Sequence, residues 1–178
     1  MSQNTTSPDR RASQDRWAPA RSIAFVLALT IPLISNCRAT DPDHAEVMAV
    51  LDAQVEAWNR GDVDGFMEHY WKSDDLTFVS TGAETDPETG VSSRVTRTIK
   101  GWRPTLERYK RRYPTRERMG KLTFRELEIA RTGDAEATVS GRFHLERAYD
   151  DHLGGTFNLD MRRMDGAWVI VGDRTVSD

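Results

Sequence analysis

The segment that decides the fold is TFNLDMRRMDGAWVIVGDRT, residues 156–175. Apolar and polar residues alternate on both sides of Asp165-Gly166, a dipeptide typical of two-residue hairpin turns. Continuing a regular register outward from this turn pairs Phe157 with Arg174. The sequence therefore predicts an antiparallel hairpin in which Arg174 shares a face with large apolar side chains.

The same alternation extends backward along the chain. Turn signals at Gly133-Asp134 and within residues 150–155 add two more strands in front of the hairpin. The alternation slips near Arg125-Glu126, where a β-bulge would restore the phase and bend the sheet. One face of this meander is apolar and needs a covering layer. Its residues are Phe143, Leu145, Phe157, Leu159, Met161, Trp168 and Ile170.

Three helices are predicted to supply that layer. Residues 47–58 carry apolar side chains at helical spacing, Asp62 can cap a second short helix, and a third helix starts near Trp102. Charged side chains of the third helix, Arg108 among them, are interpreted as a solvated outer face. We therefore expect one α+β domain, residues 41–178, with three N-terminal-side helices packed on a strongly curved antiparallel sheet.

Composition and charge restrict the possible functions. The chain has 178 residues, 38% of them hydrophobic and 30% charged, and a net charge of −3, as expected for a soluble protein of one domain. Because no basic surface is indicated, nucleic acid is not expected as a partner. The four histidines lack metal-ligand spacing, and the sequence has neither a phosphate loop nor a dinucleotide fingerprint. We therefore expect no metal and no cofactor, and no motif fixes a reaction.

Residues 1–40 are predicted to be a leader and linker. Arginines precede the apolar run Ile23–Ile34, which is too short to cross a membrane and is typical of a secretory signal. Cys37, the only cysteine, follows this run as in bacterial lipoprotein signals, which predicts lipidation of that residue. Ordinary cleavage after Ala39 is the alternative. Either way we expect export to the bacterial cell envelope, with a lipid anchor in the first case and a periplasmic or secreted protein in the second.

Five segments carry a family resemblance. They are AWNRGD (57–62), YWKSDDLTF (70–78), GW (101–102), YKRRYP (109–114) and GAWVIV (166–171). In this order they resemble the SnoaL-like family of the nuclear-transport-factor-2-like (NTF2-like) superfamily, largely members of unknown function. The resemblance implies a cone of helices on a bent sheet, with a pocket at the open end and frequent dimerisation through the outer sheet face. The superfamily contains ketosteroid-isomerase-like enzymes as well as non-catalytic binding modules, so the resemblance does not fix an activity.

Two positions near the C-terminus depart from that family. Relatives usually have histidines where this chain has Gly172 and Arg174, so a histidine-based acid–base mechanism lacks its titrating group here. A guanidinium group on an apolar concave face needs compensation. Arg174 is therefore expected either to form an ion pair with Asp75 or Glu68 or to bind an anionic ligand.

Aromatic side chains of the predicted helices are candidates for the pocket wall. Buried Tyr and Trp need partners for their polar ends, which favours a pocket, but aromatic residues at helical spacing also fill cores. Both roles stay open for them. With Arg174, the candidate ligand-pocket residues are Tyr70, Trp102, Tyr109, Trp58 and Tyr113. The ligand expected from this set is small and anionic or aromatic.

Three functions remain open at this point. The first is a small-molecule-binding module without catalysis. The second is a lyase or isomerase that uses a pocket carboxylate and tyrosine in place of histidine, which a raised carboxyl pKa beside a pocket tyrosine would favour. The third is a dimerising interaction domain with a vestigial pocket. The predicted outer sheet face mixes Val169 and Val171 with polar groups, a composition suited to a homodimer.

Overall fold

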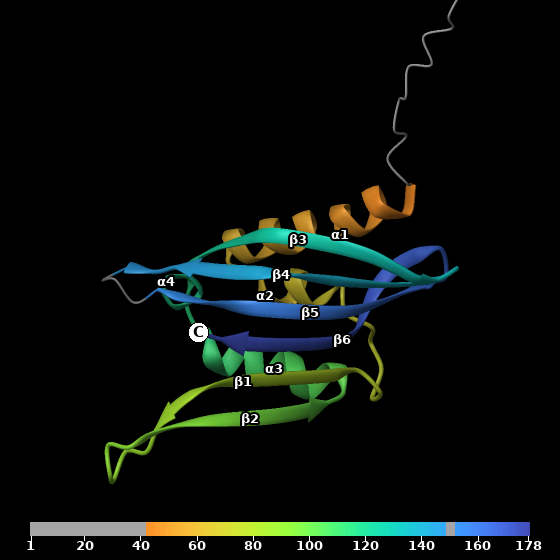
Figure 1. Cartoon of the computed structure of the whole chain (residues 1–178). Helices are drawn as coiled ribbons and strands as arrows, with labels where there is room; N and C mark the ends of the chain where they lie inside the picture. Colours follow the sequence, from red (N-terminus) through yellow and green to blue (C-terminus); the bar gives the residue numbers. More distant parts are fainter. Residues whose placement is uncertain (1–41, 149–151) are drawn as a thin grey trace, which may run out of the picture. The chain divides into compact units, whose positions relative to one another are not determined.

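The computed structural model describes residues 42–148 and 152–178 of the chain (Figure 1). Its elements follow one another as α1 (Pro42–Arg60), α2 (Val63–Met67), β1 (Thr77–Thr85), β2 (Ser92–Lys100), α3 (Trp102–Arg112), α4 (Arg116–Met119), β3 (Lys121–Gly133), β4 (Glu136–Glu146), β5 (Leu153–Met164) and β6 (Ala167–Ser177). The strands form one curved sheet, and the helices lie on one of its faces. The predicted α+β fold is therefore confirmed.

The sheet has the order β2-β1-β6-β5-β4-β3, so β2 and β3 are its edges. Neighbouring strands are antiparallel except for β1 and β6, which run parallel. This pair departs from the wholly antiparallel sheet expected from the sequence. It is possible because β1 is joined to β6 by a long connection that includes α3, and a parallel pair needs such a crossover rather than a hairpin.

The turn between β5 and β6 matches its prediction. Asp165 and Gly166 have φ values of 51° and 84°, as a type I′ hairpin turn requires, and the first pairs beyond the turn follow the predicted register. The β-bulge expected in β3 is also present. The register of β3 against β4 shifts just after Arg125, and Glu126 has a φ of 53°.

A second β-bulge, which the regular register of the sequence pattern does not predict, lies in β6. The pairing with β5 shifts after Ile170, so Val171 is an extra residue and Leu159 pairs with Asp173. Successive strand residues point to opposite sides, so one extra residue exchanges the faces of everything beyond it. Asp173 consequently faces the helices, with 4% of its surface exposed, and Arg174 faces away from them.

The apolar sheet face packs under α1 and α2, and the core contains all the apolar-face residues that the sequence predicts. Two side chains fasten the end of α1 to α4 and to the start of β3. The amide of Asn59 donates to the Leu122 carbonyl at 3.0 Å and accepts from the Leu122 N–H at 2.7 Å. Trp58 Nε1 donates to the Met119 carbonyl at 3.1 Å. These bonds fix the end of α1 against the start of β3.

The segment between α2 and β1 is attached to β6. Asp62 caps α2 as predicted, and the chain then runs beside β6, where Tyr70 forms a parallel bridge with Ile170. The Trp71 N–H donates to the Ile170 carbonyl at 2.9 Å, and the Ile170 N–H donates to the His69 carbonyl at 2.9 Å. Tyr70 lies between His69 and Trp71 in the sequence and is thereby held beside Ile170, just before the bulge of β6.

No helix within residues 42–148 and 152–178 has the length and hydropathy needed to span a membrane. The predicted leader, with Cys37 and Ala39, lies outside the described residues. Export and lipidation therefore stay predictions.

Candidate functional site

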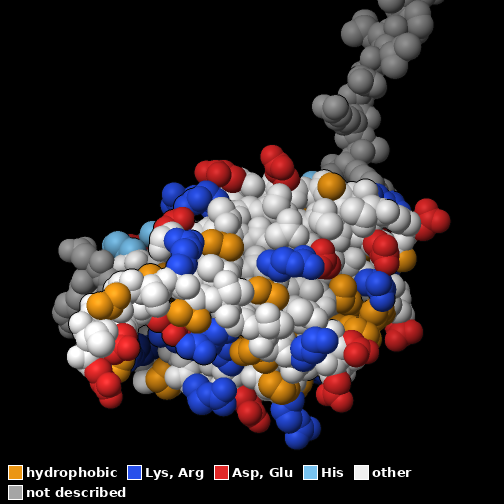
Figure 2. Space-filling view, turned by 60° about the horizontal axis from the view of Figure 1, so that its bottom comes forward, with side chains coloured by type: hydrophobic (Ala, Val, Ile, Leu, Met, Phe, Trp, Pro, Cys, Tyr) orange, Lys and Arg blue, Asp and Glu red, His pale blue; other side chains and the backbone are white. Residues whose placement is uncertain are grey.

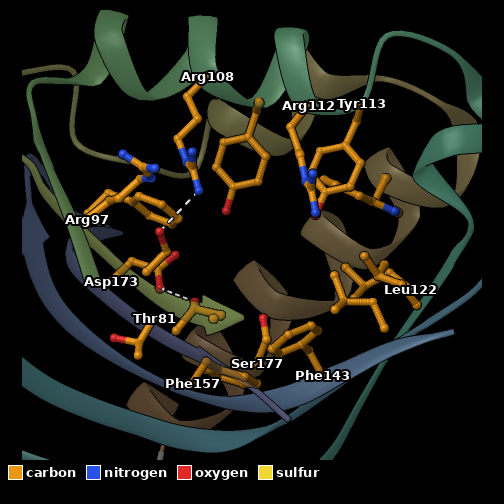
Figure 3. Close-up of a pocket in the computed structure, with 18 of the residues that line it drawn as sticks. Thr81, Arg97, Arg108, Arg112, Tyr113, Leu122, Phe143, Phe157, Asp173 and Ser177 are labelled. Carbon is orange, nitrogen blue, oxygen red and sulfur yellow. Dashed lines mark hydrogen bonds between the residues drawn. The ribbon is translucent and has the colours of Figure 1, made fainter. Parts of the chain in front are cut away.

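A cavity of about 650 Å³ lies between the helical layer and the concave sheet face (Figure 3). Thr85 and Ser177, at the ends of β1 and β6, line it, so it opens at this end of the sheet. The sheet contributes an apolar wall made of Leu122, Phe124, Phe143, Phe157 and Leu159. Aromatic and basic side chains of the helices face that wall.

Asp173 is a buried carboxylate in the wall of this cavity. Its Oδ2 accepts a hydrogen bond from the Tyr70 hydroxyl at 2.7 Å, and its Oδ1 accepts one from the Thr175 hydroxyl at 2.9 Å. Its neighbour Arg174 pairs instead with Asp160 at 2.8 Å. The carboxylate is therefore held by hydroxyl groups rather than by a cation.

The environment of Asp173 shifts the protonation equilibria of the site. Burial raises the pKa of Asp173 to about 6, although the hydroxyl groups of Tyr70 and Thr175 and the charge of Arg174 act in the opposite direction. Burial also raises the pKa of Tyr70 and of Tyr109 well above the usual tyrosine value, and the Asp173 charge adds to both shifts. A carboxyl group that titrates near neutrality beside two neutral phenols is suited to proton transfer.

The two tyrosines belong to a cluster of aromatic rings on the helix side. The ring centroid of Tyr109 lies 5.4 Å from that of Phe66 and 6.1 Å from that of Trp58. Phe66 also contacts Tyr70, at 5.8 Å, and Tyr113 stacks on Tyr109 at 6.1 Å. Rings at these separations attract one another and restrict each other's motion. The cluster therefore fixes where the tyrosine hydroxyl groups lie.

Three arginines line the cavity from α3 and β2 (Figure 3). Arg108 is half-buried and donates to the Ser80 hydroxyl at 3.1 Å. Arg112 follows one helical turn later. Arg97 of β2 forms a bidentate ion pair with Glu84, with distances of 2.8 and 2.5 Å. The cavity thus has a buried carboxylate on one strand and guanidinium groups on the facing helix.

The histidines do not belong to the cavity wall. His69 is partly buried, and burial lowers its pKa. The rings of His144 and His152 are 5.6 Å apart, near the end of β4. In the part of the chain that the structure describes, no group of three or more His, Cys, Asp or Glu side chains could hold a metal ion.

The structure gathers four of the predicted aromatic residues around the cavity, namely Trp58, Tyr70, Tyr109 and Tyr113. Trp102 lies elsewhere. Its indole N–H donates to the Met67 carbonyl at 2.9 Å, which fastens the start of α3 to α2. Lys72 covers its ring at 5.4 Å. Trp102 therefore has a structural role in the helical layer.

Arg174 does not lie on the cavity side, so its predicted position is wrong. The bulge at Val171 turns it to the outer face of the sheet, where it donates to Asp160 and leaves 57% of its side chain exposed. Within the described residues, it pairs with neither Asp75 nor Glu68, its expected partners. The error arises from a register shift of one residue, which reverses the faces of a strand.

Sequence reasoning missed Asp173, Arg108 and Arg112. Asp173 is assigned to the outer face when a regular register is continued to the end of β6. A signal of the bulge is nevertheless present, because residues 169–171 break the alternation and Gly172 follows them inside a strand. Arg108 is interpreted as solvated because a helical charge pattern alone does not show that a helix borders a cavity.

Comparison with solved structures identifies the family. An NTF2-like protein of unknown function from Shewanella oneidensis MR-1 is 33% identical to this chain, with a TM-score of 0.63, and the match covers 75% of this chain and 98% of that one. The chain therefore belongs to the NTF2-like family. A scan against protein-family models and a search of curated proteins gave no match.

Two further solved structures share the fold at lower identity. A ketosteroid isomerase-like protein from Erwinia carotovora atroseptica SCRI1043 is 19% identical, with a TM-score of 0.53 and coverage of 78% of this chain and 98% of that one. An NTF2-like protein of unknown function from Pseudomonas putida KT2440 is 16% identical, with a TM-score of 0.53 and coverage of 74% and 84%. The superfamily expected from the sequence is confirmed, and the narrower SnoaL-like assignment stays a prediction.

Proposed function

We propose that the cavity binds a small organic molecule and moves a proton within it, with Asp173 as the base. The observation that carries this proposal is the buried hydrogen bond from Tyr70 to Asp173, a carboxyl group whose pKa is raised to about 6. Such a pair in a pocket favours an acid–base enzyme over a passive binding module. The proposed class is a lyase or isomerase within a SnoaL-like group.

The chemistry follows from the protonation states. At pH 7 a carboxyl group with a pKa of about 6 is mostly ionised and can accept a proton from a bound carbon or oxygen acid. The neutral phenol of Tyr109 would donate a hydrogen bond to the oxygen anion that forms. Return of the proton to another atom of the substrate gives isomerisation, and departure of a leaving group gives elimination. Either outcome uses the same Asp173 and Tyr109.

A binding module without catalysis is the second candidate, and the aromatic lining of the cavity supports it. Aromatic and apolar walls with a few polar groups are common to most small-molecule sites, catalytic or not. The third candidate, an interaction domain with a vestigial pocket, is less well supported, because side chains leave about 650 Å³ open. Catalysis therefore has to be tested separately from binding.

Solvent hydrogen exchange tests the catalytic proposal. A panel of small ketones, enones and β-hydroxy acids is incubated with the protein in D2O and followed by proton NMR. We expect deuterium to enter at least one compound, and to enter at least about 100-fold more slowly with Asp173→Asn. Asp160→Asn, which removes a carboxylate from the outer face, is the matched control and should keep the rate. Exchange that survives Asp173→Asn would exclude Asp173 as the base.

We also propose that the leader, residues 1–40, directs export and that Cys37 anchors the protein to a membrane of the bacterial envelope. The position of Cys37 directly after the apolar run supports lipidation. A radioactive fatty acid should label the wild-type protein and should not label Cys37→Ser. If neither protein is labelled and both are released in soluble form, ordinary cleavage after Ala39 is the answer.

A homodimer through the outer sheet face is a further proposal. Val169 and Val171 are partly exposed there beside polar residues, a composition suited to an isologous interface. Analytical ultracentrifugation of residues 41–178 at micromolar concentration should show a dimer. A monomer under these conditions would leave the face simply solvated.

A further inference from the structure

The side of α3 that borders the cavity carries two arginines. Arg108 and Arg112 are four residues apart, so they project from the same side of the helix, and both line the cavity (Figure 3). Arg111 lies on the solvent side, where it pairs with Glu107 at 3.7 Å and leaves 72% of its side chain exposed. Two positive charges of α3 therefore border the cavity, that of the half-buried Arg108 and that of the more exposed Arg112.

Neither of these guanidinium groups forms an ion pair within the described residues. Arg108 donates to the neutral hydroxyl of Ser80 and lies 5.8 Å from the ring of Phe78. Both arginines interact with Glu84, but the hydrogen bonds of that carboxylate go to Arg97, which is the main reason for its lowered pKa. The charges of Arg108 and Arg112 are therefore largely uncompensated.

The remaining acidic groups of the cavity are engaged elsewhere. Asp178 pairs with Arg142 at 2.7 Å, and Asp173, which lies on β6, accepts the hydrogen bond of the Tyr70 hydroxyl. The helix side of the cavity is therefore positive in a protein whose net charge is −3. Figure 2 shows several basic side chains around a recess in the lower left part of the view, with acidic side chains beside them.

We propose that the substrate is an apolar organic carboxylate whose anionic group binds between Arg108 and Arg112. Guanidinium groups bind carboxylates through paired charge-assisted hydrogen bonds, and a partly dry cavity strengthens the attraction. The rings of Phe124 and Phe157, 4.9 Å apart, provide a surface for the apolar body. This inference rests on the proposed function, because it places the part of the same substrate that loses the proton at Asp173.

Binding of a matched pair of probes tests the inference. Calorimetry in low-salt buffer compares 2-naphthaleneacetate with its neutral analogue 2-naphthaleneacetamide. We expect the carboxylate to bind the wild-type protein at least about tenfold more tightly. Arg112→Gln should remove most of this preference, and Arg111→Gln, which removes a charge from the solvent side of the same helix, should retain it.

Arg108 needs a second variant because it also contacts Ser80. Arg108→Gln should lose the preference, and Arg108→Lys should recover part of it if charge rather than packing is responsible. Equal binding of the two probes to the wild type, no binding of either at millimolar concentration, or equal losses in Arg111→Gln and Arg112→Gln would overturn the inference. Hydrogen exchange unaffected by Asp173→Asn would instead overturn the proposed base and leave these binding results standing.

Discussion

The hydroxyl group of Tyr70 lies 2.7 Å from a carboxylate oxygen of Asp173, although 103 positions separate the two residues in the sequence. Two features of β6 produce this approach. Backbone hydrogen bonds attach the Tyr70 segment at Ile170, and the extra residue Val171 then turns Asp173 toward the helices. The hydrogen bond between Tyr70 and Asp173 therefore depends on one extra residue in β6.

Asp173 should make the stability of the protein depend on pH. Its pKa of about 6 lies above the ordinary value of 3.8, so the folded chain binds this proton more tightly than the unfolded chain does. The stability that this group contributes is therefore present below about pH 4 and is lost as the pH rises through about 6, with a total change of about 3 kcal/mol. Urea unfolding at several pH values measures this change.

The comparison with Asp173→Asn isolates that contribution. Burial lowers the pKa of His69, which gives the opposite trend, since protonation of His69 destabilises the folded state at low pH. The difference in unfolding free energy between wild type and Asp173→Asn cancels this background. A difference that stays constant from pH 4 to pH 8 would show that Asp173 titrates normally.

Tyr70→Phe should raise the pKa of Asp173 further above 6, because the hydrogen bond from Tyr70 favours the ionised carboxylate. The variant should lose about 1–3 kcal/mol of stability at pH 8 and less at pH 5, where the carboxyl group is protonated. Carbon-13 NMR of the Asp173 carboxyl group measures the midpoint.

Tyr113→Phe is the matched control for Tyr70→Phe. Tyr113 lines the same cavity and stacks on Tyr109, but its hydroxyl group makes no hydrogen bond to Asp173. The midpoint of Asp173 should stay near 6 in this variant. A midpoint that moves equally in both variants would show that cavity polarity, rather than the 2.7 Å hydrogen bond, sets the pKa.

Asn59→Ala should destabilise the junction of α1 and β3. The substitution leaves both the N–H and the carbonyl of Leu122 without their side-chain partner, which should cost about 2 kcal/mol. Glu56→Ala on the same helix removes only an exposed ion pair with Arg60 and should change stability by less than about 0.5 kcal/mol. Thermal unfolding of the two variants compares them, and equal effects would contradict the role of Asn59.

Local patterns predict most of the fold. The Asp165-Gly166 turn, the apolar face of the meander and the bulge near Arg125 all follow from alternation and from turn residues with positive φ. The cap at Asp62 is also local, because its carboxylate accepts a hydrogen bond from the Gly65 N–H three residues later. These features depend on neighbours in the sequence, so the sequence is sufficient to predict them.

The site is harder to predict because it depends on contacts between distant segments. Residues 169–171 are all apolar, so apolar and polar residues do not alternate there. The sequence pattern therefore does not show which residue of β6 is extra. A regular register places Asp173 on the outer sheet face, but in the structure it lines the cavity. The same register places Arg174 on the cavity side, but in the structure it lies on the outer face. The aromatic candidates fare better, because a wrong strand register does not change the face of a helical residue such as Tyr109.

Arg174→Leu distinguishes the observed register from the regular one. In the regular register Arg174 would lie on the apolar face. Its replacement would then either leave a buried carboxylate uncompensated, which destabilises the fold, or remove anion binding. In the structure it forms an exposed pair with Asp160, and such pairs contribute about 0–1 kcal/mol. We therefore expect Arg174→Leu to change the unfolding free energy by less than about 1 kcal/mol and to bind 2-naphthaleneacetate as the wild type does.

A double-mutant cycle with Asp160→Asn completes this test. The coupling energy between Arg174 and Asp160 should be small, as for other exposed ion pairs. The pKa of Asp173 should rise only slightly when Arg174 is replaced, because burial is the main cause of its shift and the Arg174 charge is the weakest of the opposing influences. A loss of several kcal/mol together with lost carboxylate binding would instead place Arg174 inside the cavity and contradict the bulge at Val171.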